Sequence, residues 1–181
     1  IAQFRGSPEG PSTTRESKML QQAKQRIDHL AIIVRPENLD AYVEKFSKLL
    51  GVSFDDSIYA EDAGVRAALS WDSGLEIVAP LREEGRYWER LQRFGEGCTV
   101  LVFGVDDIDA ASDRANDMGI ETREWRFDPK YPWLRRFSSF REVKVEAFPP
   151  EFAMELTFSE IIPRSDTDAD DVPCKLVEPL A

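Results

Sequence analysis

The order of predicted elements occurs twice along the chain, and this duplication constrains the fold more than any other feature. Residues 27–34 form a β-branched, apolar stretch typical of a buried strand. The segment 39–51 has apolar residues every three or four positions and ends in a glycine, as an amphipathic helix does. Residues 98–105 and 108–119 repeat this strand and helix. The sequence therefore predicts two copies of one structural unit.

Three short extended stretches follow each predicted helix, separated by residues that favour turns. Their ranges are 52–58, 65–71 and 75–79 in the first copy and 121–127, 142–148 and 152–162 in the second. Large apolar residues on one face of 81–94 predict a connecting helix between the copies. The predicted fold is α+β, with tandem βαβββ units at 27–94 and 95–163.

The two ends of the chain differ in composition from this body. Residues 1–26 are interpreted as a flexible N-terminal arm or an added leader, with Met19 as the candidate native start. Residues 164–181 are interpreted as an acidic, solvated tail. Its run 166–170 resembles the start of a calcium loop, but Asp171 and Val177 replace the glycine and glutamate that such a loop requires.

Composition narrows the class of partner. The chain is 42% hydrophobic and 31% charged, which supports a folded core, and its net charge of -11 disfavours nucleic acid and anionic membranes. Cys98 and Cys174 lack metal-type spacing, and no apolar run reaches the roughly 20 residues of a membrane span. We expect a cytoplasmic protein whose partners are a small molecule and a second copy, as a homodimer.

Several motifs, in this order and spacing, resemble the vicinal oxygen chelate superfamily, which includes glyoxalases, bleomycin resistance proteins and dioxygenases. The motifs are IDHLAIIV at 27–34, GVRAAL at 64–69, GLEIVAP at 74–80, GEG at 95–97 and FGVDDI at 103–108. The resemblance covers residues 27–162 and is greatest to the methylmalonyl-CoA epimerase-like branch. It implies that the two units form a curved sheet around a cleft, and that this cleft holds a divalent metal.

The resemblance maps the metal ligands onto His29, Glu76, Val100 and Glu155. Valine cannot coordinate a metal, so the third position departs from the family pattern. The resemblance also implies an enzyme, an epimerase, lyase or dioxygenase, that acts on a carbonyl or enol substrate.

Strand alternation supports the same cleft independently. In the first strand Leu30 and Ile32 suit the helix-facing side, which turns His29 to the other side. Glu76 and Glu155 are carboxylates within apolar strands, which is costly unless they are paired or bind a cation. With His29 they predict a three-ligand site for Fe(II), Mn(II), Co(II), Ni(II) or Zn(II). The metal is expected to polarise a carbonyl and stabilise an enolate while Glu155, or Glu76 if displaced, moves a proton. Without metal, the cluster of His29, Glu76 and Glu155 still predicts proton transfer, because repulsion between the carboxylates raises one pKa toward neutrality.

Each of these features has a structural alternative. A lone strand histidine is often only a hydrogen-bonded structural residue, and strand glutamates can face solvent. Cys98 is predicted on the same face as Val100. A buried cysteine usually packs as a small hydrophobic residue, and the alternative is a thiolate ligand or nucleophile. The alternating polar residues Glu142, Lys144 and Glu146 fit solvent exposure and substrate contact equally.

The segment 125–140 is aromatic and locally basic, and we favour a lid or an interface for it over a phosphate site. Two other functions compete with an enzyme. One is a metal-free protein that sequesters a hydrophobic or aromatic compound, which Val100 favours. The other is a degenerate domain that serves as a regulatory module.

Overall fold

The computed structural model describes residues 25–61 and 63–164. The predictions for the N-terminal arm, Met19, the acidic tail and Cys174 fall mostly or wholly outside these residues. The first unit contains β1 (Arg26–Ile33), the 3-10 helix η2 (Pro36–Asn38), α1 (Leu39–Leu50), β2 (Asp55–Ala60), β3 (Val65–Ser70) and β4 (Leu75–Pro80). The connecting helix α2 is Gly85–Phe94. The second unit contains β5 (Gly97–Gly104), α3 (Ile108–Asp117), β6 (Thr122–Trp125), the 3-10 helix η3 (Pro132–Arg136), β7 (Phe137–Val145) and β8 (Glu155–Pro163).

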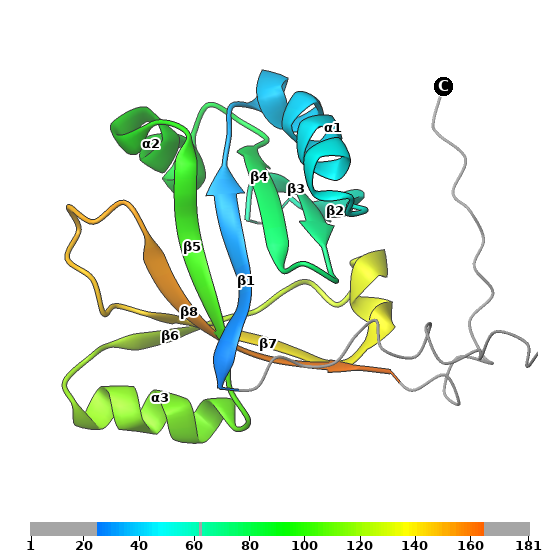
Figure 1. Cartoon of the computed structure of the whole chain (residues 1–181). Coiled ribbons are helices and arrows are strands. Elements are labelled where there is room, and N and C mark those ends of the chain that lie inside the picture. Colours follow the sequence, from blue (N-terminus) through cyan, green and yellow to red (C-terminus); the bar gives the residue numbers. More distant parts are fainter. Residues whose placement is uncertain (1–24, 62, 165–181) are drawn as a thin grey trace, which may run out of the picture.

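The strands form one curled sheet in the order β2-β3-β4-β1-β5-β8-β7-β6. At its centre β1 pairs antiparallel with β5, and each of these strands pairs parallel with the last strand of its own unit. Figure 1 shows α1 and α2 outside the first half of the sheet and α3 outside the second. This half-barrel confirms the predicted α+β fold with two βαβββ units around a concave face.

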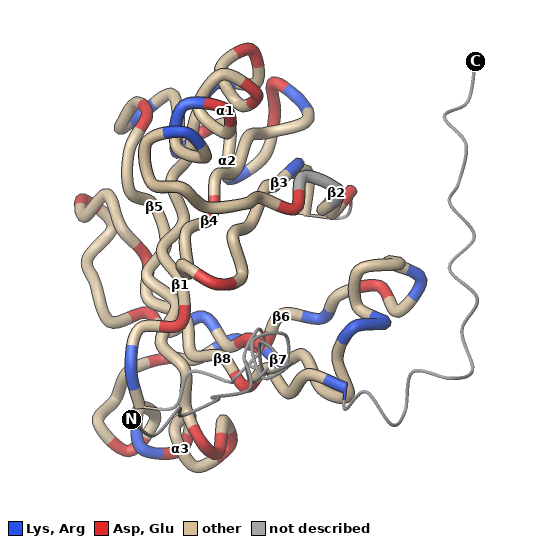
Figure 2. The backbone as a smooth tube through the Cα atoms, turned by 45° about the vertical axis from the view of Figure 1, so that its right-hand side comes forward, with Lys and Arg blue, Asp and Glu red and all other residues tan. Residues whose placement is uncertain are grey.

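Alternation along β1 separates two layers of the core, as predicted. Ile32 packs with Val34 under α1, whereas Ile33 packs on the concave side. In the second unit Phe103 packs with Ile108 of α3, and Val102 packs on the concave side. Figure 2 shows acidic and basic residues on the helices, the loops and several strands, whereas β5 at the centre of the sheet has none. No helix in the described residues is long and apolar enough to cross a membrane.

The second unit differs from its prediction between residues 126 and 155. β7 begins at Phe137, five residues before the predicted start, because β8 is long enough to pair with it from Phe137 opposite Pro163 to Val145 opposite Leu156. Ser138 and Ser139 are adjacent polar residues, so the apolar alternation that predicts a strand is absent from this extension. η3 precedes β7 and lies toward β2 and β3 across the open side of the sheet (Figure 1).

Candidate active site

A cavity of about 90 Å³ lies on the concave face of the sheet. Its walls are mostly apolar, and aromatic rings supply much of the surface. These aromatic residues are Trp71, Tyr87, Trp125, Phe127, Trp133 and Phe140. A polar cluster also lines it, consisting of His29, Glu76, Arg86, Glu142 and Thr157. A mostly apolar pocket with a few converging polar groups is the usual form of a small-molecule site.

His29 lies at the centre of the polar cluster and is 6% exposed. Its Nδ1 atom lies 2.8 Å from Oδ1 of Asp28, and its Nε2 atom lies 3.6 Å from Oε2 of Glu76. Burial by itself lowers the pKa of the imidazole. The hydrogen bond to Asp28 and the charges of Glu76 and Glu142 outweigh burial and raise the imidazole pKa to about 9. His29 is therefore a cation at neutral pH.

The two carboxyl groups of the cavity are shifted in the direction of the neutral acid. Burial raises the pKa of Glu76, and the His29 cation opposes this only in part. Burial also raises the pKa of Glu142 to about 7, with repulsion from Glu76 and Asp28 adding to it and attraction to His29 opposing it. Glu142 thus changes charge near neutral pH, as a group that accepts and returns protons must.

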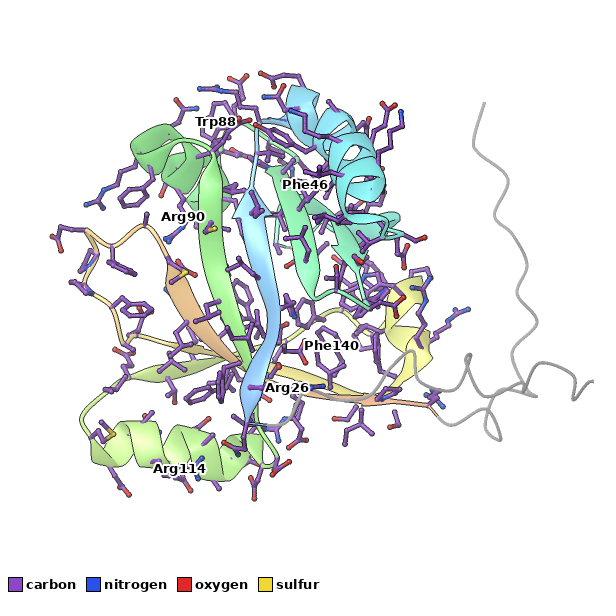
Figure 3. All side chains as sticks on the ribbon, viewed as in Figure 1. Arg26, Phe46, Trp88, Arg90, Arg114 and Phe140 are labelled. Atoms are coloured by element: carbon purple, nitrogen blue, oxygen red, sulfur yellow. The ribbon has the colours of Figure 1, made fainter. Side chains whose placement is uncertain are left out.

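Glu155, predicted beside His29 and Glu76, lies elsewhere. It lines a separate groove of about 420 Å³ with residues of α2 and of the segment before β8. Its carboxylate lies 3.2 Å from Nη1 of Arg90, 3.4 Å from Nη2 of Arg86 and 3.7 Å from Nζ of Lys144. Figure 3 shows Arg90 on the far side of β5 and β1 from Phe140, which lines the cavity. The structure brings two of the three predicted site residues together and separates the third.

Strand register explains this separation. The N–H of Val34 donates to the carbonyl of Val78 at 2.9 Å, and the N–H of Val105 donates to the carbonyl of Ser159 at the same distance. These equivalent bonds align the two units, and Glu76 and Thr157 each stand two residues before the acceptor. Thr157, buried and lining the cavity, is therefore the counterpart of Glu76. Glu155 pairs with Val100 instead, two residues out of place.

Glu142 is the site residue that sequence reasoning did not select. It lies on β7 opposite Ser159 of β8, and its side chain enters the cavity, whereas Lys144 pairs with Glu146 and Glu155. The polar alternation of β7 was the available signal. It did not distinguish a cavity from solvent, because most of the other residues that enclose the cavity come from the first unit, which is distant in sequence.

The lid predicted from the sequence is the aromatic segment 125–140. Trp133 and Phe137 are buried against first-unit residues in one core cluster, which supports the predicted lid. Arg136 forms an ion pair with Asp55 of β2, and Asp55 also accepts a hydrogen bond from Nε1 of Trp71 at 3.5 Å. These contacts connect η3 to the first unit over the cavity. Cys98 is exposed and is not among the residues that line the cavity.

The donor set of the cavity does not fit a divalent metal. Val100 packs with Ala31 and Val102 and offers no donor atom, and Glu155 is held by arginines. The contact of Nδ1 of His29 with Asp28 leaves Nε2 as the one ring atom of His29 that could bind a metal. Within residues 25–61 and 63–164, no three His, Cys, Asp or Glu side chains are arranged to hold a metal ion. The predicted ligand set of His29, Glu76 and Glu155 stays a prediction that this geometry does not favour.

Comparison with known proteins identifies the family. A family model of the Glyoxalase/Bleomycin resistance protein/Dioxygenase superfamily matches residues 28–130. The chain belongs to this superfamily. A methylmalonyl-CoA epimerase from Streptomyces coelicolor, solved with 2-nitronate-propionyl-CoA, is similar at 25% identity and a TM-score of 0.58, over 76% of this chain and 97% of that one.

Two further solved structures share the fold at lower identity. A methylmalonyl-CoA epimerase from Mycobacterium tuberculosis has 21% identity and a TM-score of 0.60, over 85% of this chain and 99% of that one. A hypothetical protein from Bacillus halodurans has 16% identity and a TM-score of 0.61, over 78% of this chain and 97% of that one. A comparison with curated protein sequences found no match. The superfamily and the epimerase neighbours suggest enzymatic activity.

Proposed function

We propose that this protein is an enzyme that moves a proton at the carbon next to a carbonyl group of a small molecule. The observation that carries the proposal is a cluster of one buried histidine and two partly buried carboxyl groups at the wall of an aromatic cavity. Glu142 has a pKa near neutrality and His29 is a cation. A base and an electrostatic stabiliser are the two parts that enolate formation needs.

In this mechanism the ionised carboxylate of Glu142 accepts the proton from the α-carbon. The electron pair of the broken C–H bond forms the enolate double bond, and the carbonyl π electrons move to oxygen. The Nε2–H group of His29 faces this developing charge. Nε2 of His29 lies 3.6 Å from Oε2 of Glu76, which is longer than a hydrogen bond, so this N–H can donate to the substrate oxygen. Return of the proton from Glu142 to another carbon of the enolate completes an isomerisation, whereas an epimerisation is completed when a second donor, such as water, protonates the same carbon from the opposite face.

Glu76 and Asp28 keep His29 positively charged, which makes them positioning residues. Asp28 fixes the ring through Nδ1, and Glu76 adds a negative charge near Nε2. The methylmalonyl-CoA epimerase neighbours support proton transfer next to a carbonyl as the reaction class. The expected homodimer and cytoplasmic location stay predictions.

The test is exchange of α-hydrogens in D₂O, followed by proton NMR with a panel of small ketones and thioesters. We expect deuterium incorporation with the wild type and at least about a hundredfold slower exchange with Glu142→Gln, the usual size of a general-base effect. Glu146→Gln is the matched control, because Glu146 follows the same strand but is exposed and contacts Lys144. Absence of exchange in every carbonyl compound that binds contradicts the proposal.

A second function, binding without catalysis, is favoured by the aromatic lining and by Val100. A protein that only sequesters an aromatic compound needs the walls of the cavity and not its ionisable cluster. In that case Glu142→Gln retains the affinity of the wild type, and neither protein exchanges the α-hydrogens of the bound compound.

A further inference from the structure

Trp133 carries a buried polar group that the proposed reaction does not use. The side chain lines the cavity and is 5% exposed. Its indole Nε1–H has no hydrogen-bond acceptor among the described residues. A buried donor without a partner costs roughly 1–3 kcal/mol, so such groups are normally satisfied by water or by a ligand. Because the side chain lines the cavity, an acceptor for this N–H would come from a molecule bound there, with a small shift of the atoms that cover Nε1.

The other cavity tryptophans show that this donor is unusual. Nε1 of Trp71 donates to Asp55, and Trp125 stacks against the guanidinium of Arg86 at 4.3 Å. The ring of Trp133 is held on one side by Tyr131, stacked at 6.1 Å, and meets Phe127 and Phe140 in edge contacts. This packing fixes the indole in one orientation and surrounds it with apolar surface. A fixed donor in apolar surroundings selects strongly for an acceptor.

The charges of the cavity indicate that the ligand is neutral. Its two cations already face carboxylates, since His29 contacts Asp28 and Arg86 contacts Glu155. A substrate carboxylate would have no unpaired cation and would lie beside the carboxyl groups that line the same wall. Burying a charge in this way is unfavourable.

We propose that the cavity takes a neutral, planar aromatic carbonyl compound, and that the indole N–H of Trp133 donates a hydrogen bond to its oxygen. The aromatic walls bind the ring by stacking and edge contacts. A carbonyl oxygen has two lone pairs, so it accepts from Trp133 and from His29 together. Trp133 is then a specificity-determining residue. This inference rests on the proposed function for the identity of the reacting oxygen, but its test measures binding alone.

The test compares acetophenone with two compounds of similar shape. Ethylbenzene has no carbonyl oxygen, and benzoate carries a negative charge. Affinities are measured by calorimetry for the wild type, Trp133→Phe and the matched variant Trp71→Phe. We expect the wild type to bind acetophenone at least about tenfold more tightly than either other compound. Trp133→Phe should lose about five- to tenfold in acetophenone affinity and keep its ethylbenzene affinity. Trp71→Phe removes an N–H that donates to Asp55 and not to the ligand. It should lower the affinities for acetophenone and ethylbenzene to the same extent or not at all.

A second measurement covers the case in which Trp133→Phe does not fold. The carbonyl stretch of acetophenone bound to the wild type should lie at lower frequency than in a hydrocarbon solvent, as a hydrogen-bonded ketone shows. Tightest binding of benzoate, equal loss for ketone and hydrocarbon in Trp133→Phe, or an unshifted carbonyl stretch would each overturn the proposal. Binding as expected without α-hydrogen exchange refutes the proposed reaction and leaves this inference standing.

Discussion

Nε2 of His29 lies 3.6 Å from Oε2 of Glu76, a contact between neighbouring parallel strands of the first unit. This distance gives strong charge coupling without occupying the N–H in a short hydrogen bond. The neighbouring carboxylates raise the pKa of His29, and the His29 cation limits the rise in the pKa of Glu76 and Glu142. The cluster therefore titrates as a set, and both folding and the proposed reaction depend on its protonation.

Replacement of Glu142 should change how stability depends on pH. The pKa of Glu142 is raised from 4.5 to about 7 in the folded protein, so the folded state binds its proton more tightly than the unfolded state does. Its contribution is fully present below pH 4.5 and is lost as pH rises through about 7. At 1.36 kcal/mol per pKa unit, the loss is up to about 3 kcal/mol.

Urea unfolding of wild type and Glu142→Gln between pH 4 and 8 measures this difference, with about 1 kcal/mol resolution needed. The variant should gain stability relative to the wild type as pH rises across that range. Carboxylates outside this cluster change stability equally in both proteins and cancel in the comparison. A difference in stability that does not vary with pH would mean that the cavity does not raise the pKa of Glu142.

The rate of α-hydrogen exchange should have a bell-shaped pH profile. Activity rises through about pH 7 as Glu142 loses its proton, because only the carboxylate accepts one. It falls through about pH 9 as His29 loses its charge and no longer stabilises the enolate. His29→Gln should lose the falling limb and most of the rate, and a falling limb that persists in this variant would assign it to another group.

Glu155 should matter for stability and little for chemistry. Its carboxylate is 18% exposed and contacts Arg86, Arg90 and Lys144, so Glu155→Gln leaves several cations with a weaker partner. We expect a loss of about 1–3 kcal/mol in the free energy of unfolding, below the range for fully buried pairs. Exchange, measured at a temperature where both proteins are folded, should fall far less than in Glu142→Gln. Equal loss of exchange in the two variants would return Glu155 to the active site.

Gly74 should be intolerant of any side chain. Its φ of +65° favours glycine, and a Cβ there would lie 2.4 Å from the carbonyl oxygen of Asp28, next to His29. Gly51 is the matched control, because its φ is +69° and nothing lies within 4 Å of its Cβ position. Thermal unfolding should show a loss of about 1 kcal/mol for Gly51→Ala from backbone strain, and at least about 2 kcal/mol more for Gly74→Ala. Equal losses would show that the close approach is absent.

Much of the fold was predictable because it depends on local periodicity. Alternation in residues 27–34 placed His29 and Ile33 on the concave face, and the structure agrees. The pairing of β5 with β8 was not predictable, because no local rule sets the register of strands that are some 50 residues apart. The family resemblance placed Glu76 and Glu155 at equivalent positions, but the register of β8 puts Thr157 in the cavity instead. Glu142 was missed for a related reason, since the cavity that its side chain enters is lined largely by residues of the first unit, which is distant in sequence.

The third family position, Val100, gives a direct test of metal binding. Val100 is 9% exposed and lines the cavity wall, so a histidine there adds a donor to those of His29 and Glu76. We expect Val100→His to gain thermal stability with Zn(II), Co(II) or Ni(II), by about 2.7 kcal/mol at a metal concentration one hundred times the dissociation constant. The wild type and Val100→Asn, whose amide is a weak ligand, should gain none and should lose none with a chelator. Elemental analysis of protein purified without affinity-resin metal provides the second measurement. Stoichiometric metal in the wild type, or stabilisation of it by added metal, would contradict the metal-free mechanism and restore the ligand set predicted from the sequence, with Glu142 as the candidate that replaces Glu155.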